Sequence, residues 1–116
     1  MKPLIKFDEF IEIGNRLEIK VGKIIHVEEI PKSSKLIKLT VSFGEDDIRT
    51  VVTNIKNQLI DIKGSFTCIE GVSFLFITNL HPVQMMGIES TAMIMPGELE
   101  KSLLCEVIAQ SGTKIL

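Results

Sequence analysis

The chain has 116 residues, 45% of them hydrophobic and 24% charged, and its formal net charge is −2. This length suits one domain with a modest hydrophobic core, and the composition is that of a globular protein. The negative net charge argues against indiscriminate binding to nucleic acid, which requires a basic surface. Most of the 13 basic residues precede Thr40, however, and acidic residues cluster at positions 45–47. A local basic patch on an acidic protein is therefore compatible with the sequence.

Membrane insertion and secretion are not indicated. No apolar run approaches the roughly 18 residues that a membrane-spanning helix needs. Near the N-terminus, Lys6, Asp8 and Glu9 interrupt the apolar segment that a secretion signal would require. We therefore expect a cytoplasmic protein with no membrane partner.

The residues with catalytic or metal-binding potential are scattered. Cys68 and Cys105 are far apart in apolar surroundings and no C-x-x-C pair occurs, which favours buried free thiols over a disulfide or a metal site. His26 and His81 have no obvious Ser or Cys nucleophile as a partner, and glycine-rich phosphate-binding motifs are absent. We expect a protein that is not an enzyme and that binds no metal or cofactor.

The first expected element is a short amphipathic helix over residues 7–13, ended by Gly14. Phe7, Phe10 and Ile11 share one face of it, and we expect the two phenylalanines to pack into the core rather than to bind a ligand.

A long half-buried strand is expected over residues 17–30, because apolar and polar residues alternate there. Gly22 predicts a bulge or sharp bend within it. The residues expected to face inward are Leu17, Ile19, Val21, Ile25 and Val27.

Further strands are expected at residues 37–43, 48–55, 72–80, 90–95 and 102–108, with turns at 31–35 and 44–47, a short helix or turn at 56–61 and an irregular segment at 65–71. This order predicts an all-β protein with short helices: an OB-fold, which is a five-stranded Greek-key barrel, with an N-terminal helical turn and an extra C-terminal strand. We expect a single domain over residues 1–116 with a core at about 15–96, whose extensions 1–14 and 97–116 face an interface or partner.

The segment 81–89 is expected to be an exposed loop between two strands. Pro82 breaks the preceding apolar run and Gly87 permits a bend. Two interpretations stay open for Met85 and Met86: the loop is an ordinary connection whose methionines pack into the core, or it is a binding loop.

The stretch from 79 to 95 resembles the tRNA-binding domain at the C-terminus of many methionyl-tRNA synthetases. That domain also occurs as a stand-alone tRNA-binding protein and in the synthetase cofactor processed to a monocyte-activating polypeptide. The matching residues are Asn79, Leu80, Pro82, Met86, Gly87, Ser90 and Met93, while Ala92 replaces the family's usual glycine. Earlier matches are residues 20–24 and Pro31, Lys35, Leu36, Lys38 and Leu39, and Asn54 stands where the family has glycine.

The resemblance implies a binding face between two loops, residues 28–35 and 81–89, which flank that face in an OB-fold. Lysines would contact phosphates, Ser90 a phosphate or ribose hydroxyl, and Met93 an exposed base. The alternatives are solvated lysines on a strand face, a core Met93, and asparagines that cap local turns. The candidate RNA-binding residues are Lys23, Lys35, Lys38, Asn54, Asn79, Gln84, Met86, Ser90 and Met93.

The aromatic residues favour one class of RNA. Trp and Tyr are absent, and the six Phe residues lie in or beside apolar segments. OB-folds that bind single strands without sequence preference stack bases on exposed aromatic side chains. Recognition of folded RNA by its shape and backbone therefore fits better.

The predicted function is that of a non-catalytic tRNA-binding protein, resembling a beta-type subunit or appended domain of methionyl-tRNA synthetase and accessory to that enzyme. The resemblance implies tRNA as partner, a synthetase catalytic chain as a possible second partner, and a homodimer. The first alternative is a secretion-type, protein-binding chaperone of the same fold, using Met85, Met86 and Ile88. The second alternative is an assembly module of a synthetase complex.

Overall fold

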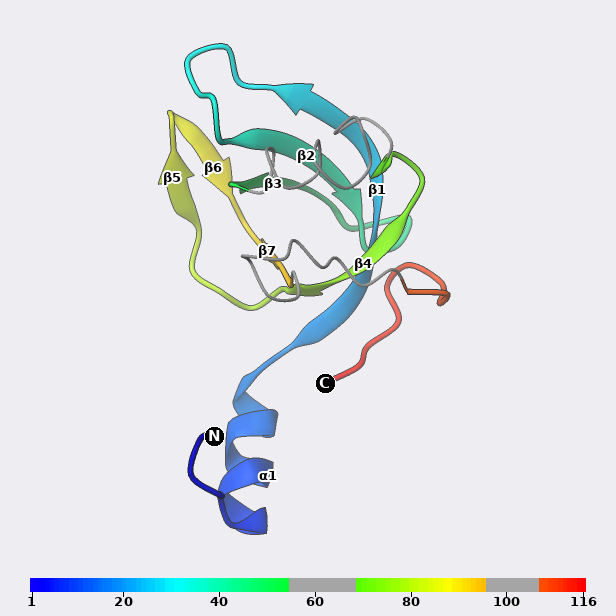
Figure 1. The fold of residues 1–116 in the computed structure, drawn as a ribbon. Helices are drawn as coiled ribbons and strands as arrows, with labels where there is room; N and C mark the ends of the chain where they lie inside the picture. The colour runs from blue at the N-terminus through cyan, green and yellow to red at the C-terminus, as the bar shows by residue number, and fades with distance from the viewer. Residues whose placement is uncertain (55–68, 96–106) are drawn as a thin grey trace.

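The computed structural model describes residues 1–54, 69–95 and 107–116. It consists of a β-barrel with one N-terminal helix that extends away from it (Figure 1). The elements in chain order are α1 (Phe7–Arg16), β1 (Ile19–Glu29), β2 (Ile37–Ser42), β3 (Ile48–Thr53), β4 (Ser73–Ile77), β5 (Val83–Met85), β6 (Ile88–Ser90) and β7 (Met93–Ile94). The predicted five-stranded OB-fold barrel is confirmed.

Five antiparallel strands form the barrel in the order β3-β2-β1-β4-β7. The long strand β1 pairs with β4 along its first half and with β2 along its second half. The barrel closes where the chain between β6 and β7 meets β3: the Thr91 N–H donates to the Thr50 carbonyl over 3.2 Å. The strands β5 and β6 form a separate two-stranded sheet beside this seam.

The core lies inside the barrel and consists of aliphatic residues around Phe74 and Phe76, which are fully buried. The ring of Phe43 meets that of Phe76 edge to face, with centroids 5.3 Å apart. Gly22 lies against this cluster, and a Cβ there would come within 2.6 Å of the Phe43 and Val41 side chains. Only glycine fits this position without displacing core side chains.

The inward face of β1 differs from the prediction at one residue. Ile25, which was expected to face inward, is 42% exposed, whereas Ile24 is fully buried. The pairing of β1 with β2 shifts between Ile24 and His26, so an extra residue enters the strand and the alternation changes sides. The irregularity therefore falls after Gly22 rather than at it.

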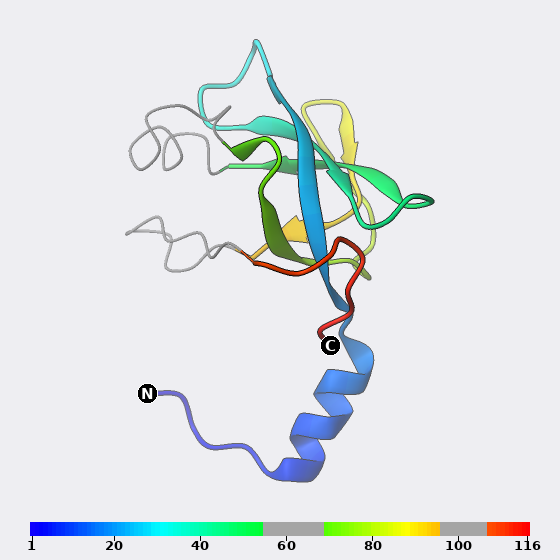
Figure 2. The same ribbon diagram turned by 90° about the vertical axis from the view of Figure 1, so that its right-hand side faces the viewer.

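The helix α1 ends at Arg16, two residues beyond the expected Gly14. It projects from the barrel (Figure 2), and none of its residues is buried. Phe7 is 78% and Phe10 43% exposed, so the prediction that they pack into the core is wrong. No helix in the described part of the chain is long and apolar enough to cross a membrane.

The C-terminal tail pairs with the first half of β1, on the edge that β4 leaves free. The Val21 N–H donates to the Thr113 carbonyl over 2.9 Å, and Lys20 and Lys114 form an isolated bridge. The expected strand 102–108 is not seen at residues 107 and 108, and its residues 102–106 lie outside the described residues. The expected elements at 56–61 and 65–68, with Cys68 and Cys105, also lie outside them.

Candidate nucleic-acid interface

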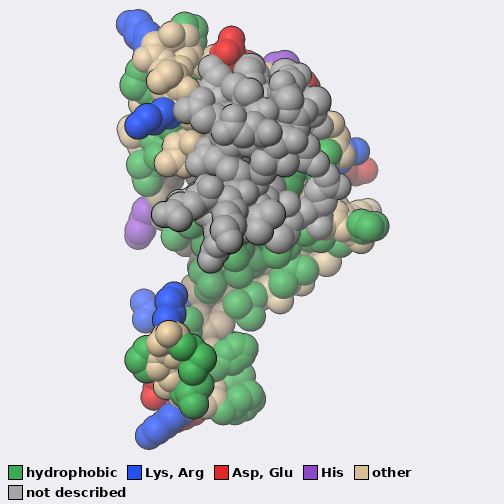
Figure 3. Space-filling view, viewed as in Figure 1, with side chains coloured by type: hydrophobic (Ala, Val, Ile, Leu, Met, Phe, Trp, Pro, Cys, Tyr) green, Lys and Arg blue, Asp and Glu red, His purple; other side chains and the backbone are tan. Residues whose placement is uncertain are grey.

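Two connections project from the same end of the barrel, as predicted for the two loops (Figures 1 and 2). One is the β1–β2 loop, residues 30–36, and the other is the hairpin of β5 and β6. Inside the β1–β2 loop the Ser33 hydroxyl accepts hydrogen bonds from the N–H groups of Lys35 and Leu36, over 3.3 and 3.0 Å. Separate patches of basic side chains lie at this end of the molecule in Figure 3, and Lys35 is exposed.

Lys38 stands at the start of β2 between Glu28 of β1 and Val52 of β3. Its Nζ lies 3.9 Å from Glu28 Oε2, and its side chain is 32% exposed. The other oxygen of that carboxylate lies 3.3 Å from His26 Nε2. Lys38 is close to the two connections, but part of its charge is already opposed by Glu28.

Lys23 does not join the other two lysines. It is exposed on β1 and pairs across the sheet with Ser42, at the far end of β2 from Lys38. The structure thus brings Lys35 and Lys38 to one end and leaves Lys23 toward the other.

The segment 81–89, expected to be a loop, contains a tight hairpin. Met85 pairs with Ile88, and Met86 and Gly87 form the turn with φ of 52° and 79°. Positive φ at both central residues defines the turn type that matches the twist of paired strands. Gln84 and Met86 are exposed on this hairpin, so Met86 does not pack into the core.

Ser90 lies at the base of the hairpin and is only 7% exposed. Its hydroxyl accepts a hydrogen bond from the Val52 N–H over 3.0 Å and donates one to the Ala92 carbonyl over 3.3 Å. The hydroxyl therefore joins the hairpin to β3 and faces into the protein.

A small, mostly apolar pocket of about 110 Å³ opens beside Ser90. Met93 borders it and is 49% exposed, which excludes the alternative that Met93 belongs to the core. The other lining residues are Val52, Leu80, His81, Val83, Met85, Ser90 and Ala92.

The two candidate asparagines occupy different places. Asn79 Oδ1 accepts from the Glu18 N–H over 2.8 Å, and its Nδ2 donates to the Arg16 carbonyl over 2.7 Å. Asn79 therefore joins the end of β4 to the junction of α1 and β1, through long-range hydrogen bonds rather than as the cap of a local turn that the alternative predicted. Asn54 is exposed directly after β3.

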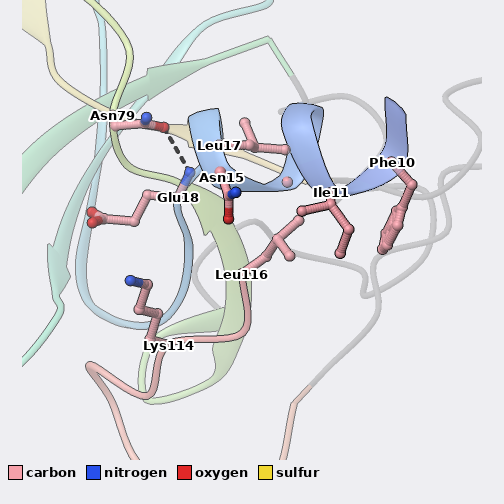
Figure 4. A pocket seen from close by; sticks show the side chains of 9 residues that line it. Phe10, Ile11, Asn15, Leu17, Glu18, Asn79, Lys114 and Leu116 are labelled. Carbon is pink, nitrogen blue, oxygen red and sulfur yellow. Dashed lines mark hydrogen bonds between the residues drawn. The ribbon is translucent and has the colours of Figure 1, made fainter. Parts of the chain in front are cut away.

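A larger cavity of about 320 Å³ separates α1 from the barrel. Figure 4 shows Phe10 and Ile11 of the helix on the same side as the C-terminal Leu116, with Asn79 and Glu18 across the cavity. A hydrogen bond of 2.6 Å from the Thr78 hydroxyl is the main cause that lowers the pKa of the Glu18 carboxyl.

Arg49 is a structurally important residue that the sequence did not single out. Its Nε and one terminal nitrogen donate to the Asp47 carboxylate, which holds the Asp47 pKa below its usual range. Its other nitrogen donates to the carbonyl of Thr78 over 2.8 Å, and its guanidinium lies 5.3 Å from the centre of the Phe43 ring. The sequence did contain a signal for this role, because Arg49 is a lone arginine in a β-branched strand, two residues after Asp47.

Among the described residues, no group of three or more His, Cys, Asp or Glu could hold a metal ion.

Comparisons with known proteins find a matching family and similar chains. Residues 19–113 match the family described as "Putative tRNA binding domain". The chain is 38% identical to the Methionine--tRNA ligase of Methanospirillum hungatei over an alignment of 119 positions, which covers 97% of this chain and 16% of the relative. For the same enzyme of Methanococcus aeolicus, the identity is 39% over 87% of this chain and 14% of the relative. The chain thus spans about a sixth or less of the length of these curated relatives.

Two solved structures resemble the whole chain. The MetRS related protein from Pyrococcus horikoshii superposes with a TM-score of 0.76 at 31% identity, covering 99% of this chain and 100% of that one. The chaperone CsaA from Bacillus anthracis superposes with a TM-score of 0.69 at 22% identity, covering 98% and 100%. At that identity the second likeness is one of fold alone.

Proposed function

Because the chain belongs to the tRNA-binding domain family, we propose that it binds folded tRNA through one end of its barrel and catalyses no reaction itself. The observation that carries the proposal is the position of the β1–β2 loop and the β5–β6 hairpin at that end, with Lys35 exposed beside them. Phosphate contacts from lysines would supply affinity, and the shape of the RNA would supply selectivity.

Competition between ligands tests this function. Labelled tRNA bound to the protein is challenged with unlabelled tRNA or with unstructured poly-pyrimidine RNA of equal length. We expect the folded tRNA to compete better, because no aromatic platform for stacking bases lies at this end among the described residues. Equal or better competition by the unstructured RNA would contradict the proposal.

Within the cell, the protein acts as an accessory of methionyl-tRNA synthetase, as a beta-type subunit or a homologue of an appended domain. Its similarity to a segment of the archaeal enzymes supports this role. The catalytic chain of that synthetase is the expected second partner. Aminoacylation by the synthetase at limiting tRNA, with and without this protein, measures the effect: a lower KM for tRNA is expected, and an unchanged KM would contradict the role.

The protein also forms a homodimer through α1. The helix presents Phe7, Phe10 and Ile11 to solvent, and Leu116 lies beside Phe10 and Ile11 at the cavity that they line. Covering such a face removes apolar area from water. Sedimentation at tens of micromolar should give a dimer; a monomer would leave the helix to a different partner chain.

Binding of unfolded polypeptide is the second candidate function. It is favoured by the exposure of Val83 and Met93 at the small pocket and of Met86 at the turn of the hairpin, since methionine-rich surfaces adapt to varied apolar segments. An unfolded, reduced polypeptide that displaces tRNA from the same sample would support it. A pure assembly module would bind neither ligand while still binding the synthetase.

A further inference from the structure

The turn of the β5–β6 hairpin has an unusual residue at its apex. Across residues 1–54, 69–95 and 107–116, Met86 alone among non-glycine residues has a positive φ, at 52°. A positive φ is energetically unfavourable for an L-amino acid with a side chain, and Asn, Asp or Gly normally occupy such a turn. Strained backbone positions occur preferentially at functional sites, so a methionine kept here needs a reason other than turn geometry.

The position of the side chain supplies such a reason. Met86 is 51% exposed at the turn of the two-stranded hairpin, on the end of the barrel that also carries Lys35. Its neighbour across the turn, Gly87, has open space around its Cα. The methionine is therefore an exposed apolar group at this end, held at a turn that the pairing of β5 with β6 closes.

The same end of the barrel has no exposed Phe, Trp or Tyr side chain in the described part of the chain. Phe43, Phe74 and Phe76 are buried in the core, and Phe7 and Phe10 lie on α1. The face of a nucleobase is aromatic, and a thioether sulfur makes favourable contacts with aromatic rings. Methionine is also among the apolar side chains that proteins insert between stacked bases.

We infer that Met86 packs its thioether against the face of a nucleobase exposed on the surface of folded tRNA, while the lysines hold the neighbouring phosphates. This contact rests on the proposed function and assigns the hairpin apex a role within it. A nucleic acid is favoured over an apolar peptide because an exposed lysine accompanies the methionine, which suits a ligand that carries both an aromatic face and a negative backbone.

Substitution by asparagine separates the contact from the turn. Asparagine tolerates positive φ better than methionine does, so Met86→Asn should keep or raise the melting temperature. It removes the thioether, so tRNA affinity should fall by about two- to tenfold, the range expected for one sulfur–aromatic contact. Because no charge changes, the salt dependence of binding should match that of the parent. Met86→Leu, which keeps an apolar side chain, should retain part of the affinity.

Two further variants separate the possible outcomes. Ile48→Thr removes exposed apolar surface at the opposite end of β3 and should bind tRNA like the parent. If Lys35→Ala weakens tRNA binding while Met86→Asn does not, the base contact is wrong and the proposed function stands. If the parent binds no tRNA, both fail. If Met86→Asn lowers binding of unfolded polypeptide but not of tRNA, the apex belongs to a peptide site and the inference is overturned.

Chemical probing of the bound tRNA reads the contact directly. One base should be protected by the parent protein, become reactive with Met86→Asn and be protected again with Met86→Leu. The same protection pattern for the parent and the asparagine variant would overturn the inference.

Discussion

The two ends of the molecule both expose apolar side chains, but in different settings. On α1 they form a broad stripe, with Phe7 78% and Ile13 55% exposed, and a cavity of about 320 Å³ lies beside it. At the hairpin end, single apolar residues such as Met86 stand near an exposed lysine and a pocket of about 110 Å³. A broad apolar stripe suits a protein surface, whereas a smaller set of apolar groups beside an exposed lysine suits RNA, which combines aromatic bases with a negative backbone. The difference supports the proposal that assembly uses one end and tRNA binding the other.

The largest expected effect comes from placing a charge on the helical stripe. Phe10→Lys keeps helix propensity but would bury an ammonium group in the proposed dimer interface. We expect the dissociation constant of the dimer to rise by at least about 100-fold, or about 3 kcal/mol. Sedimentation at several concentrations measures it.

Glu12→Lys is the control, because Glu12 is an exposed residue of the same helix that does not line the cavity. A dimer that survives Phe10→Lys, or one that Glu12→Lys weakens equally, would remove the assignment of assembly to this stripe. The tRNA affinity of each monomer's barrel should stay unchanged when RNA binding is measured per protomer.

Ser90 tests the role of a buried residue at the hairpin end, because its hydroxyl is directed into the protein. Ser90→Ala leaves the Val52 N–H without its acceptor, so the free energy of unfolding should fall by about 1–3 kcal/mol. Denaturant titration measures this loss, and the exposed Ser34→Ala should show none. If Ser90→Ala instead keeps its stability and loses tRNA affinity, the hydroxyl contacts the RNA directly, as the resemblance implied.

The extent of what the sequence predicts can be followed through these residues. Alternation placed the barrel strands within a few residues, because burial on one face of a strand imposes a period of two. Alternation could not locate the extra residue near Ile25, because the position of a bulge depends on how the strand pairs with its neighbour. It also did not predict the β5–β6 hairpin, because Met86 occupies a turn position where asparagine or glycine is usual. Helical periodicity predicted α1 but not what its apolar face contacts. The same amphipathic pattern is expected for a helix that packs on its own core and for one that packs on another chain.

The candidate site shows the same division. The resemblance predicted that Lys35, Lys38 and the loop 81–89 share one binding face, but motif positions do not reveal which side chains are already hydrogen-bonded within the protein. Ser90 and Asn79 bond to backbone groups of distant segments, 38 and 63 residues away, and such contacts exist only in the folded chain.

A smaller effect is expected from Lys35→Ala. The exposed ammonium group at the end of the β1–β2 loop should contact one phosphate, so its removal should weaken tRNA binding by about 1 kcal/mol, or about fivefold. The slope of log K against log salt should fall by about one. Lys23→Ala is the matched control, because Lys23 is exposed toward the other end of β2. If Lys23→Ala costs as much, the RNA spans the barrel rather than one end.

The smallest effect tests whether Glu28 restrains the RNA-binding end. Its carboxylate lies 3.9 Å from Lys38 Nζ and 3.3 Å from His26 Nε2. On the proposed function it would compete with phosphate for Lys38 and repel the RNA backbone. Partly exposed pairs of this kind are worth about 0.2–1 kcal/mol, so Glu28→Gln should tighten tRNA binding by about two- to threefold and steepen the salt slope slightly. Glu45→Gln makes the same charge change in the exposed turn after β2 and should leave affinity nearly constant. Equal gains from both variants would attribute the effect to net charge, and a loss with Glu28→Gln would mean that Glu28 positions Lys38 for the phosphate instead of withholding it.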